Sequence, residues 1–350
     1  MRVMVTGGAG FVGSHVAEYY AKDGNEIEVF DDLSRAKILG SSPGDPLYNW
    51  NYLRSGYGNI RLIKGDVRSF EEVKAASENV DVIVHTAAQV AVTTSLSDPR
   101  TDFEINALGT FNVLEVARLR DASLVVCSTN KVYGENVNKI PVKEGKKRYS
   151  FADERYRDGV PETLPIDLTE HSPYGCSKLA ADIYTQDYAH TYGLHTAVLR
   201  MSCIYGERQF GVEDQGFIAH FVISATLGKE ITIYGTGKQV RDILHVEDLV
   251  RAMDLALKKA ETSPGEVYNI GGGSSNALSL LEIIGYIEEI SNKKIRLKFD
   301  EWRKADQRVY ISDIRKAKEK LGWKPSVLWK EGITRLCSWA LGNKQLFDRA

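Results

Sequence analysis

The sequence predicts an α/β protein in which a doubly wound parallel sheet precedes a smaller C-terminal α/β lobe. Two features indicate the sheet: apolar runs that are short and continuous, and intervening segments whose apolar residues repeat at helical spacing. Continuous apolar strands are typical of parallel strands buried on both faces, and the helices between them supply the cover. A glycine-rich turn directly after the first run is a third indication.

Five strands are expected in the first half of the chain. They are Val3 to Val5, Ile27 to Phe30, Ile60 to Ile63, Val80 to Val84 and Leu124 to Val126. Between them lie helical patterns such as Val12, Val16 and Tyr19, which are spaced i, i+4, i+7. Residues 1–200 are therefore expected to form one doubly wound domain.

The pattern changes after about Arg200, where segments become irregular and a Gly-rich stretch occurs at Gly271 to Gly273. Shorter helical patterns lie near Leu278 to Ile290 and Ile314 to Leu321. Residues 201–350 are expected to form a substrate-binding lobe, with some segments returning to the first domain. An insertion at 135–170 is rich in charge and tyrosine, and its basic residues indicate a solvated loop and not a phosphate site: Lys143, Lys146, Lys147 and Arg148.

Composition places the 350-residue chain among ordinary globular proteins, with 43% hydrophobic and 26% charged residues. Its net charge is −2 and no long run of one sign occurs, so we expect a small polar ligand and neither nucleic acid nor a membrane as partner. No secretory or membrane-spanning segment is evident, which favours a cytoplasmic protein. The four cysteines form no CxxC pair, so neither a metal site nor a disulfide framework is predicted.

The glycine-rich turn TGGAGFVG follows the first strand and predicts a Rossmann-type dinucleotide site. Gly7 allows the tight turn, Gly10 lets the backbone approach a pyrophosphate, and Gly13 lets the helix close on the sheet. Phe11 and Val12 begin this helix, whose N-terminus faces the phosphates. A plain structural turn is the alternative interpretation.

Asp31 ends the second strand about eighteen residues after Gly13, where a carboxylate can accept both ribose hydroxyls. Because that carboxylate would repel a 2′-phosphate, NAD is expected and not NADP. Asp32 and Ser34 follow in the same site, and Arg35 leaves NADP open because a guanidinium can accommodate a phosphate. The third and fourth strand ends complete the site with residues that bracket the adenine or leave room for the cofactor: Asp66, Val67, Thr86, Ala87, Ala88 and Gln89.

A later helix start, SPYGCSK, carries a candidate catalytic pair. Ser172 is suited to cap the helix and Pro173 to its first turn, and Tyr174 and Lys178 are then i, i+4 on one face. With the positive nicotinamide nearby, the Lys178 ammonium is expected to lower the tyrosine pKa from about 10, which allows a phenolate base. Taken alone, the YxxxK spacing favours an ordinary surface helix.

The fifth strand ends in CSTNKVYG, which places Thr129 at the carboxyl edge of the sheet, where its hydroxyl can bridge a substrate hydroxyl and Tyr174. Together with the glycine motif, Asp31 and the YxxxK pair, this threonine resembles the extended short-chain dehydrogenase/reductase (NAD-dependent epimerase/dehydratase) family, which acts on nucleotide sugars. The resemblance covers almost the whole chain, including INALGTFNVLEVAR around Asn106 and RDILHVEDL. It implies bound NAD in contact with Tyr174 and Lys178, and a homo-oligomer, either a dimer or a tetramer.

The residues after Thr129 distinguish reactions within this family. The 4,6-dehydratases carry Asp-Glu there, an acid and a base for eliminating water, whereas this chain has Asn130 and Lys131. The resemblance therefore favours epimerisation, which needs only removal and return of a hydride. A 4-epimerase, an enzyme of net oxidation and a non-catalytic NAD-sensing protein remain as alternatives, although the last usually lacks the tyrosine and lysine.

A closer resemblance is to the 2-epimerases that interconvert CDP-paratose and CDP-tyvelose. It lies in STNKVYG, HSPYGCSKLAAD, the segment Arg208 to Gly216 and GKQVRDILH. Cys203 stands where many 4-epimerases have an asparagine that grips the sugar diphosphate, and the 2-epimerases likewise have a small residue. The chain departs from them in the 135–170 insertion and in Asp32, which replaces the usual Asn, so the exact sugar and base stay open.

Substrate contacts follow from the same resemblance. Arg241 and Arg308 would hold the pyrophosphate through planar guanidinium groups, and a surface ion pair is the alternative for each. The other expected contacts to sugar or base, several of which have a loop-capping alternative, are Thr129, Gln89, Ser95, Asn130, Cys203, Arg208, Gln209 and Gln215. The sequence is thus interpreted as an NAD-dependent nucleotide-sugar 2-epimerase that acts through a transient 2-keto sugar, with CDP, GDP and UDP all open as the nucleotide.

Overall fold

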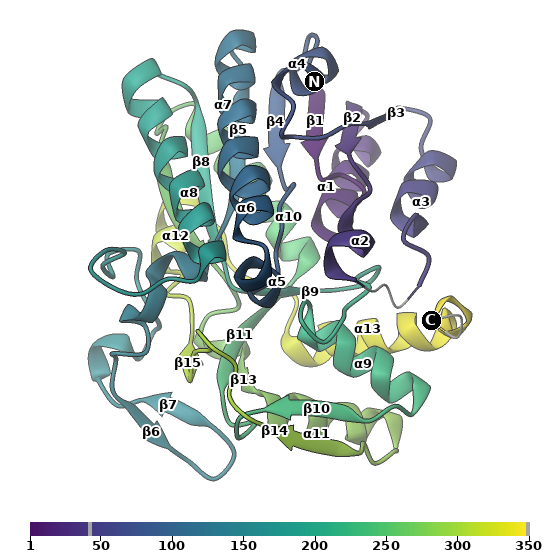
Figure 1. The fold of residues 1–350 in the computed structure, drawn as a ribbon, viewed down its shortest axis with the longest axis vertical. Coiled ribbons are helices and arrows are strands. Elements are labelled where there is room, and N and C mark those ends of the chain that lie inside the picture. The colour runs from purple at the N-terminus through teal and green to yellow at the C-terminus, as the bar shows by residue number, and fades with distance from the viewer. Residues whose placement is uncertain (41–43, 348–350) are drawn as a thin grey trace.

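A seven-stranded parallel sheet forms the centre of the molecule, of which the computed structural model describes residues 1–40 and 44–347. The strand order is β12-β8-β5-β4-β1-β2-β3, and every neighbouring pair is parallel. The strands are β1 (Arg2–Thr6), β2 (Glu26–Asp31), β3 (Ile60–Lys64), β4 (Val82–His85), β5 (Ser123–Thr129), β8 (Thr196–Met201) and β12 (Glu266–Ile270). The order reverses between β1 and β4, so the doubly wound parallel sheet is confirmed (Figure 1).

Helices cover both faces of this sheet. One face carries α1 (Phe11–Lys22), α3 (Tyr48–Gly56), α10 (Val246–Ala260) and α12 (Arg315–Leu321), and the other carries α4 (Phe70–Ala76), α7 (Gly109–Arg120) and α8 (Pro173–Tyr192). Successive strand residues point to opposite faces, so Val3 and Val5 pack in the α1 and α10 core while Met4 packs in the α7 core. Burial on both faces explains why the strands are continuously apolar.

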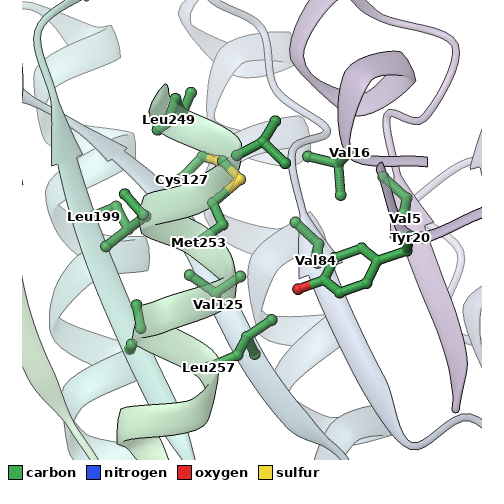
Figure 2. Packing of buried hydrophobic residues seen from close by; sticks show 14 of the residues in the cluster. Val5, Val16, Tyr20, Val84, Val125, Cys127, Leu199, Leu249, Met253 and Leu257 are labelled. Atoms are coloured by element: carbon green, nitrogen blue, oxygen red, sulfur yellow. The ribbon is translucent and has the colours of Figure 1, made fainter. Parts of the chain in front are cut away.

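Figure 2 shows the α1 and α10 side of this core. Val16 and Tyr20 from α1 and Met253 and Leu257 from α10 converge over the strands, and none of them is more than 6% exposed. Burying one such side chain stabilises the fold by about 1.5–3 kcal/mol. Because α10, α12 and β12 come from the C-terminal part of the chain, segments beyond residue 200 complete the layer around the large sheet.

The second lobe lies near the carboxyl ends of the large sheet (Figure 1). Its elements are β9 (Cys203–Tyr205), α9 (Phe217–Leu227), β10 (Ile231–Tyr234), β11 (Val240–His245), β13 (Ala277–Ser279), α11 (Leu280–Ser291), β14 (Leu297–Asp300), β15 (Val309–Tyr310) and α13 (Trp329–Gly342). Helices α9, α11 and α13 share one apolar core with β10 and β11. The helical pattern expected near 278–290 is α11, whereas that near 314–321 is α12, which packs on the large sheet and not within the lobe.

The insertion at 135–170 is more ordered than the solvated loop expected from its charge. It contains an antiparallel hairpin of β6 (Val142–Glu144) and β7 (Tyr149–Phe151). Arg148 anchors the hairpin, because its guanidinium donates to Glu282 of α11 at 2.5 Å and to the Ala277 carbonyl at 3.0 Å. Tyr149 is buried beside Val309. The sequence did not indicate these contacts, because Ala277 and Glu282 lie more than a hundred residues from Arg148 in the chain.

Short helices complete the described structure. They are α2 (Arg35–Leu39), α5 (Val92–Ser97), α6 (Pro99–Phe103), the π-helix η1 (Glu104–Leu108), and the 3-10 helices η2 (Asn130–Asn136), η3 (Glu154–Tyr156), η4 (Ser274–Asn276) and η5 (Lys344–Leu346). Within residues 1–40 and 44–347, no helix has both the length and the apolar character needed to cross a membrane.

The contact between α1 and the turn before it predicts the effect of Gly13→Ala. A Cβ atom at Gly13 would lie 2.2 Å from the Gly7 carbonyl oxygen and 2.7 Å from the Gly8 Cα, so the helix must shift. We expect a loss of about 1–3 kcal/mol in the free energy of unfolding, measured by urea denaturation. Gly285→Ala is the matched control, because nothing lies within 4 Å of its new Cβ in α11 and the added helix propensity stabilises by about 0.5–1 kcal/mol. Equal stability of the two variants would contradict the tight α1 contact.

Candidate active site

A first cavity lies at the carboxyl ends of β1, β2 and β4, where the strand order reverses. It brings together all residues expected at the cofactor site other than Tyr174 and Lys178, namely Gly7, Gly10, Phe11, Val12, Asp31, Asp32, Ser34, Arg35, Asp66, Val67, Thr86, Ala87, Ala88 and Gln89. Val90 and Gln215 line it as well. The strand ends named by the sequence therefore meet in one place.

The glycine turn forms one wall of this first cavity. Gly7 has a φ of +67°, and a Cβ atom there would lie 2.6 Å from the Ala87 amide nitrogen, so only glycine fits between β1 and the end of β4. Helix α1 begins after Gly10, which has no side chain to occupy the first N–H groups of the helix. These N–H groups are therefore open to phosphate oxygens, as a dinucleotide pyrophosphate requires.

Asp31 faces the same cavity from the end of β2. Its carboxylate accepts hydrogen bonds from the backbone N–H groups of Ala9 at 2.9 Å and Leu33 at 2.8 Å. Burial raises the pKa of Asp31 to about 6, although these backbone donors act to lower it. The group is mainly ionised at neutral pH, and it keeps acceptor capacity for a ribose diol because a carboxylate has about four lone-pair sites.

Arg35 is the residue that made NADP an alternative cofactor in the sequence, and residues of the second lobe hold its side chain. Its guanidinium donates to the Phe210 carbonyl at 2.9 Å and to Gln215 Oε1 at 2.7 Å. Asp32 accepts from the N–H and hydroxyl of Ser34 and so fixes the turn after β2. The charged group that remains at the ribose position is Asp31, which favours NAD.

The candidate catalytic residues lie together at the junction of β5 and α8. Ser172 caps α8 by accepting the Gly175 N–H at 3.1 Å, as expected from the sequence. Thr129, Tyr174 and Lys178 are only 8%, 8% and 3% exposed. Thr129 faces the Tyr174 phenol closely enough to lower its pKa, and its hydroxyl donates to Asn130 Oδ1 at 3.3 Å. None of the three is a lining residue of the first or the second cavity.

The sequence predicts that Lys178 lowers the pKa of Tyr174. In the protein without cofactor the pKa of Tyr174 is raised instead. Burial raises the pKa of Tyr174 to about 12, and the hydrogen bond with Thr129 is the influence that lowers it. Burial also lowers the pKa of Lys178, against the effects of Cys127, Asp182 and Asp102. The i, i+4 spacing indicates only that the positive charge of Lys178 lies near the phenol. Desolvation of the phenolate has the larger effect on the pKa of Tyr174.

A second cavity adjoins the first, because Val90 and Gln215 line both. Of the residues expected to bind substrate, it contains Cys203, Gln215 and Arg241. Arg241 donates to Asp306 at 2.5 Å and is 8% exposed. Burial raises the pKa of the Cys203 thiol to about 11, so this residue is a small neutral group in the wall.

Two arginines expected at the substrate site lie elsewhere. Arg308 is exposed and lines a separate cavity with Glu135 and Asn138, and it lines neither the first nor the second cavity. Arg208 is buried, pairs with Glu18 of α1 at 2.7 Å and stacks over the Tyr52 ring at 4.3 Å. The expectation that these two residues hold the substrate is therefore not supported by their positions.

Three polar candidates do not line the second cavity and are hydrogen-bonded within the protein. Gln209 Nε2 donates to the Ile204 carbonyl at 3.2 Å, and Ser95 donates to the Val92 carbonyl at 2.7 Å. Asn130 Nδ2 donates to Gln307 Oε1 at 3.3 Å. The loop-capping alternative describes Gln209, whereas Ser95 lies within α5 and donates to a carbonyl of its own helix.

Three basic residues of the second cavity were not expected from the sequence, namely Lys131, Arg303 and Lys304. Lys131 lines it and donates to the Ala305 carbonyl at 3.0 Å, and burial lowers its pKa. Arg303 pairs with Asp214 at 2.8 Å and lies 4.0 Å over the Tyr234 ring. The signal for Lys131 was available, since it follows Thr129 by two residues at a strand end. No sequence signal indicated Arg303, because its partners Asp214 and Tyr234 come from distant segments.

The sequence model of the NAD dependent epimerase/dehydratase family matches residues 3–271. The chain belongs to this family. NAD is its cofactor, in agreement with the glycine turn, Asp31 and the cavity that they line.

Several relatives resemble the chain along nearly its whole length. It is 39% identical over 348 residues to the CDP-paratose 2-epimerase of Salmonella typhi, with 97% of this chain and 99% of that protein covered. It is 32% identical to a putative UDP-glucose 4-epimerase of Methanocaldococcus jannaschii, with 98% and 99% covered. The structure of UDP-glucuronic acid 4-epimerase from Bacillus cereus, in complex with UDP-glucuronic acid and NAD, matches with a TM-score of 0.81 at 27% identity, covering 99% of this chain and 100% of that one.

The position of Asp31 predicts weaker NAD binding in Asp31→Asn. Loss of a charged acceptor for the ribose is expected to raise the dissociation constant about 10- to 100-fold, measured by calorimetry on protein stripped of dinucleotide. Asp32→Asn is the matched control, because that carboxylate is used by Ser34. If Asp31→Asn bound NAD as tightly as this control, the ribose contact would be wrong.

Proposed function

We propose that the chain is an NAD-dependent nucleotide-sugar 2-epimerase, an isomerase of the CDP-paratose to CDP-tyvelose type. The observation that carries the proposal is the junction at Val90 and Gln215, where the cofactor cavity meets a second cavity that bears cations. A sugar in the second cavity can present one carbon to the cofactor while Arg241 and Lys131 face its diphosphate. The 39% identity to a CDP-paratose 2-epimerase supports carbon 2 as that carbon.

In the proposed reaction Tyr174 removes the proton from the hydroxyl on carbon 2, and Thr129 orients that hydroxyl. NAD, when bound, supplies the acceptor and then the donor of the hydride at the same carbon. Lys178 stabilises the phenolate form of Tyr174 through its positive charge. The resulting 2-keto sugar turns within the second cavity, and Tyr174 returns the proton to its oxygen after hydride has come back to the opposite face. No net oxidation results.

The residues after Thr129 support epimerisation over elimination of water. Asn130 is hydrogen-bonded to Gln307, and the Lys131 ammonium is hydrogen-bonded to the Ala305 carbonyl. Neither side chain offers the carboxyl acid and base that elimination needs next to the threonine. The position instead supplies a cation to the substrate cavity, which suits a diphosphate or a sugar oxygen.

A nucleotide-sugar 4-epimerase is the second candidate, because relatives bearing that name share the fold and the same length of chain. The cavity wall near the junction favours the first candidate. Val90, Val92 and Leu96 line it with apolar groups, and Val90 and Leu96 are 37% and 48% exposed. Such a wall suits a deoxygenated sugar, because hydroxyl groups placed against it would lose their hydrogen bonds to water.

The proposed base predicts the effect of Tyr174→Phe. Turnover is expected to fall about 10²- to 10⁴-fold, the usual contribution of a general base, with NAD content unchanged. Thr129→Val is expected to cost less, about tenfold, since it removes one hydrogen bond and not the base. Tyr184→Phe, at an exposed position of the same helix, is the matched control. Turnover of the Tyr174 variant within twofold of this control would refute the role of Tyr174.

The reacting carbon is tested with CDP-paratose that carries deuterium at carbon 2 or at carbon 4. We expect the carbon 2 label to slow conversion, because that C–H bond breaks when hydride leaves, and the carbon 4 label to have no effect. Single-turnover mixing with excess enzyme is the measurement, since slow product release would otherwise hide the chemical step.

The opposite labelling pattern would make the chain a 4-epimerase. The product is analysed for configuration at both carbons, and CDP, GDP and UDP sugars are compared in parallel. Inversion at carbon 4 alone, with any of the three nucleotides, would overturn the proposed function.

A further inference from the structure

A buried polar network around Asp102 of α6 lies between the cofactor cavity and α8. Asp102 is 1% exposed. Its Oδ1 accepts from Gln89 Nε2 at 2.7 Å and Asn106 Nδ2 at 3.1 Å, and its Oδ2 accepts from the Ser177 hydroxyl at 2.5 Å. All three partners can donate to an ionised, acceptor-only carboxylate. Burial raises the pKa of Asp102, and the hydrogen bonds from Ser177 and Gln89 and the charge of Lys178 act to lower it.

This network joins the cofactor wall to the helix of the candidate base. Gln89 lines the cofactor cavity, and its backbone exchanges hydrogen bonds of 2.9 and 3.0 Å with the Asn106 side chain. Asn106 lies in the π-helix η1, a type of helical irregularity that is frequent at functional sites. Ser177 lies between Tyr174 and Lys178 and also donates to the Tyr174 carbonyl at 3.2 Å. A displaced Asp102 would therefore move α8 relative to Gln89.

Asp102 is a buried carboxylate whose negative charge acts on Lys178 without being neutralised by an ion pair to any described residue. No salt bridge joins Asp102 to a basic side chain in the described parts of the chain. Burial lowers the pKa of His85 to about 3 and raises that of Cys127 to about 12, so both of these neighbours are neutral. Asp182, the other carboxylate near Lys178, forms a buried ion pair with the arginine of β8 at 2.9 Å.

We propose that Asp102 is a positioning residue that holds α8, and with it Tyr174 and Lys178, against the Gln89 segment, so that its charge acts on these two residues. This inference rests on the proposed role of these two residues in proton transfer. It does not depend on which carbon of the sugar reacts.

The direction of the electrostatic effect is the same for both residues. A carboxylate disfavours a phenolate and favours an ammonium, so Asp102 raises the pKa of Tyr174 and of Lys178. The other groups that face the Tyr174 phenol are the neutral Cys127 and the Thr129 hydroxyl. Removing the charge of Asp102 should lower both pKa values. An enzyme that needs Tyr174 deprotonated and Lys178 protonated would then have both limbs of its pH profile at lower pH.

Asp102→Asn is the decisive variant, because it removes the charge and keeps the shape. Its amide oxygen can accept from Gln89 and Asn106, and its NH₂ can face the Ser177 hydroxyl, which then donates to the Tyr174 carbonyl. Ser177→Ala is the matched control, since it deletes a hydrogen bond of the network and no charge. Should the Asn variant fail to fold, Asp102→Ser removes the same charge with a smaller side chain.

The readout is the ultraviolet titration of the Tyr174 phenol in the NAD-bound protein, with Tyr174→Phe subtracted, together with the pH profile of turnover. In Asp102→Asn the titration midpoint and both limbs are expected to move down by about half a pH unit or more, and Ser177→Ala is expected to leave them in place.

An unchanged midpoint of the Tyr174 titration in Asp102→Asn would overturn the proposal. A lower turnover without a shift of the pH profile would also contradict it, because Asp102 would then have only a structural role. The phenol titration needs no substrate. A downward shift of that titration in a protein that epimerises no nucleotide sugar would support the role of Asp102 and count against the proposed function, so the two failures are distinguishable.

Discussion

Burial of Lys178 beside the carboxyl end of β5 is the constraint on which the rest of the site depends. Placing an ammonium at 3% exposure costs several kcal/mol unless opposite charge lies near it. Asp102 of α6 and Asp182 of α8 supply that charge, and each is a buried carboxylate that needs hydrogen-bond donors of its own. Asp182 finds them in Ser128 and in the arginine of β8, and Asp102 in Gln89 and its neighbours. The polar core around α8 is thus a consequence of one buried cation.

The two lobes meet through the cofactor site and not only through the substrate cavity. Arg35, at the turn after β2, donates to the Phe210 carbonyl and to Gln215, both from the second lobe. Gln215 in turn lines both cavities. The residues that shape the ribose end of the cofactor cavity are therefore bonded to a wall of the substrate cavity, so the position of the second lobe is linked to that of the β2 turn.

Much of the fold and of the cofactor cavity could be predicted because the signals are local. Gly7 and Asp31 each adjoin the strand that places them, and parallel strands bring their carboxyl ends to one edge. The substrate cavity is different, since its walls come from segments distant in sequence. Arg308 is exposed although its neighbour Gln307 is buried, and Arg208 pairs with Glu18 of α1. The pKa of Tyr174 also escaped prediction, because helical spacing shows which residues share a face and not how deeply that face is buried.

The raised pKa of Tyr174 is consistent with a reaction that removes and returns a hydride. In the protein alone, burial keeps the phenol protonated, and the Thr129 hydrogen bond offsets only part of that effect. A positive nicotinamide ring near the phenol would favour the phenolate, and a neutral ring would leave burial dominant again. Tyr174 would then tend to be a base when hydride is to be accepted by the cofactor and an acid when hydride is to be given back. The same buried residue can serve both directions of an epimerisation, because its protonation would follow the charge of the ring beside it.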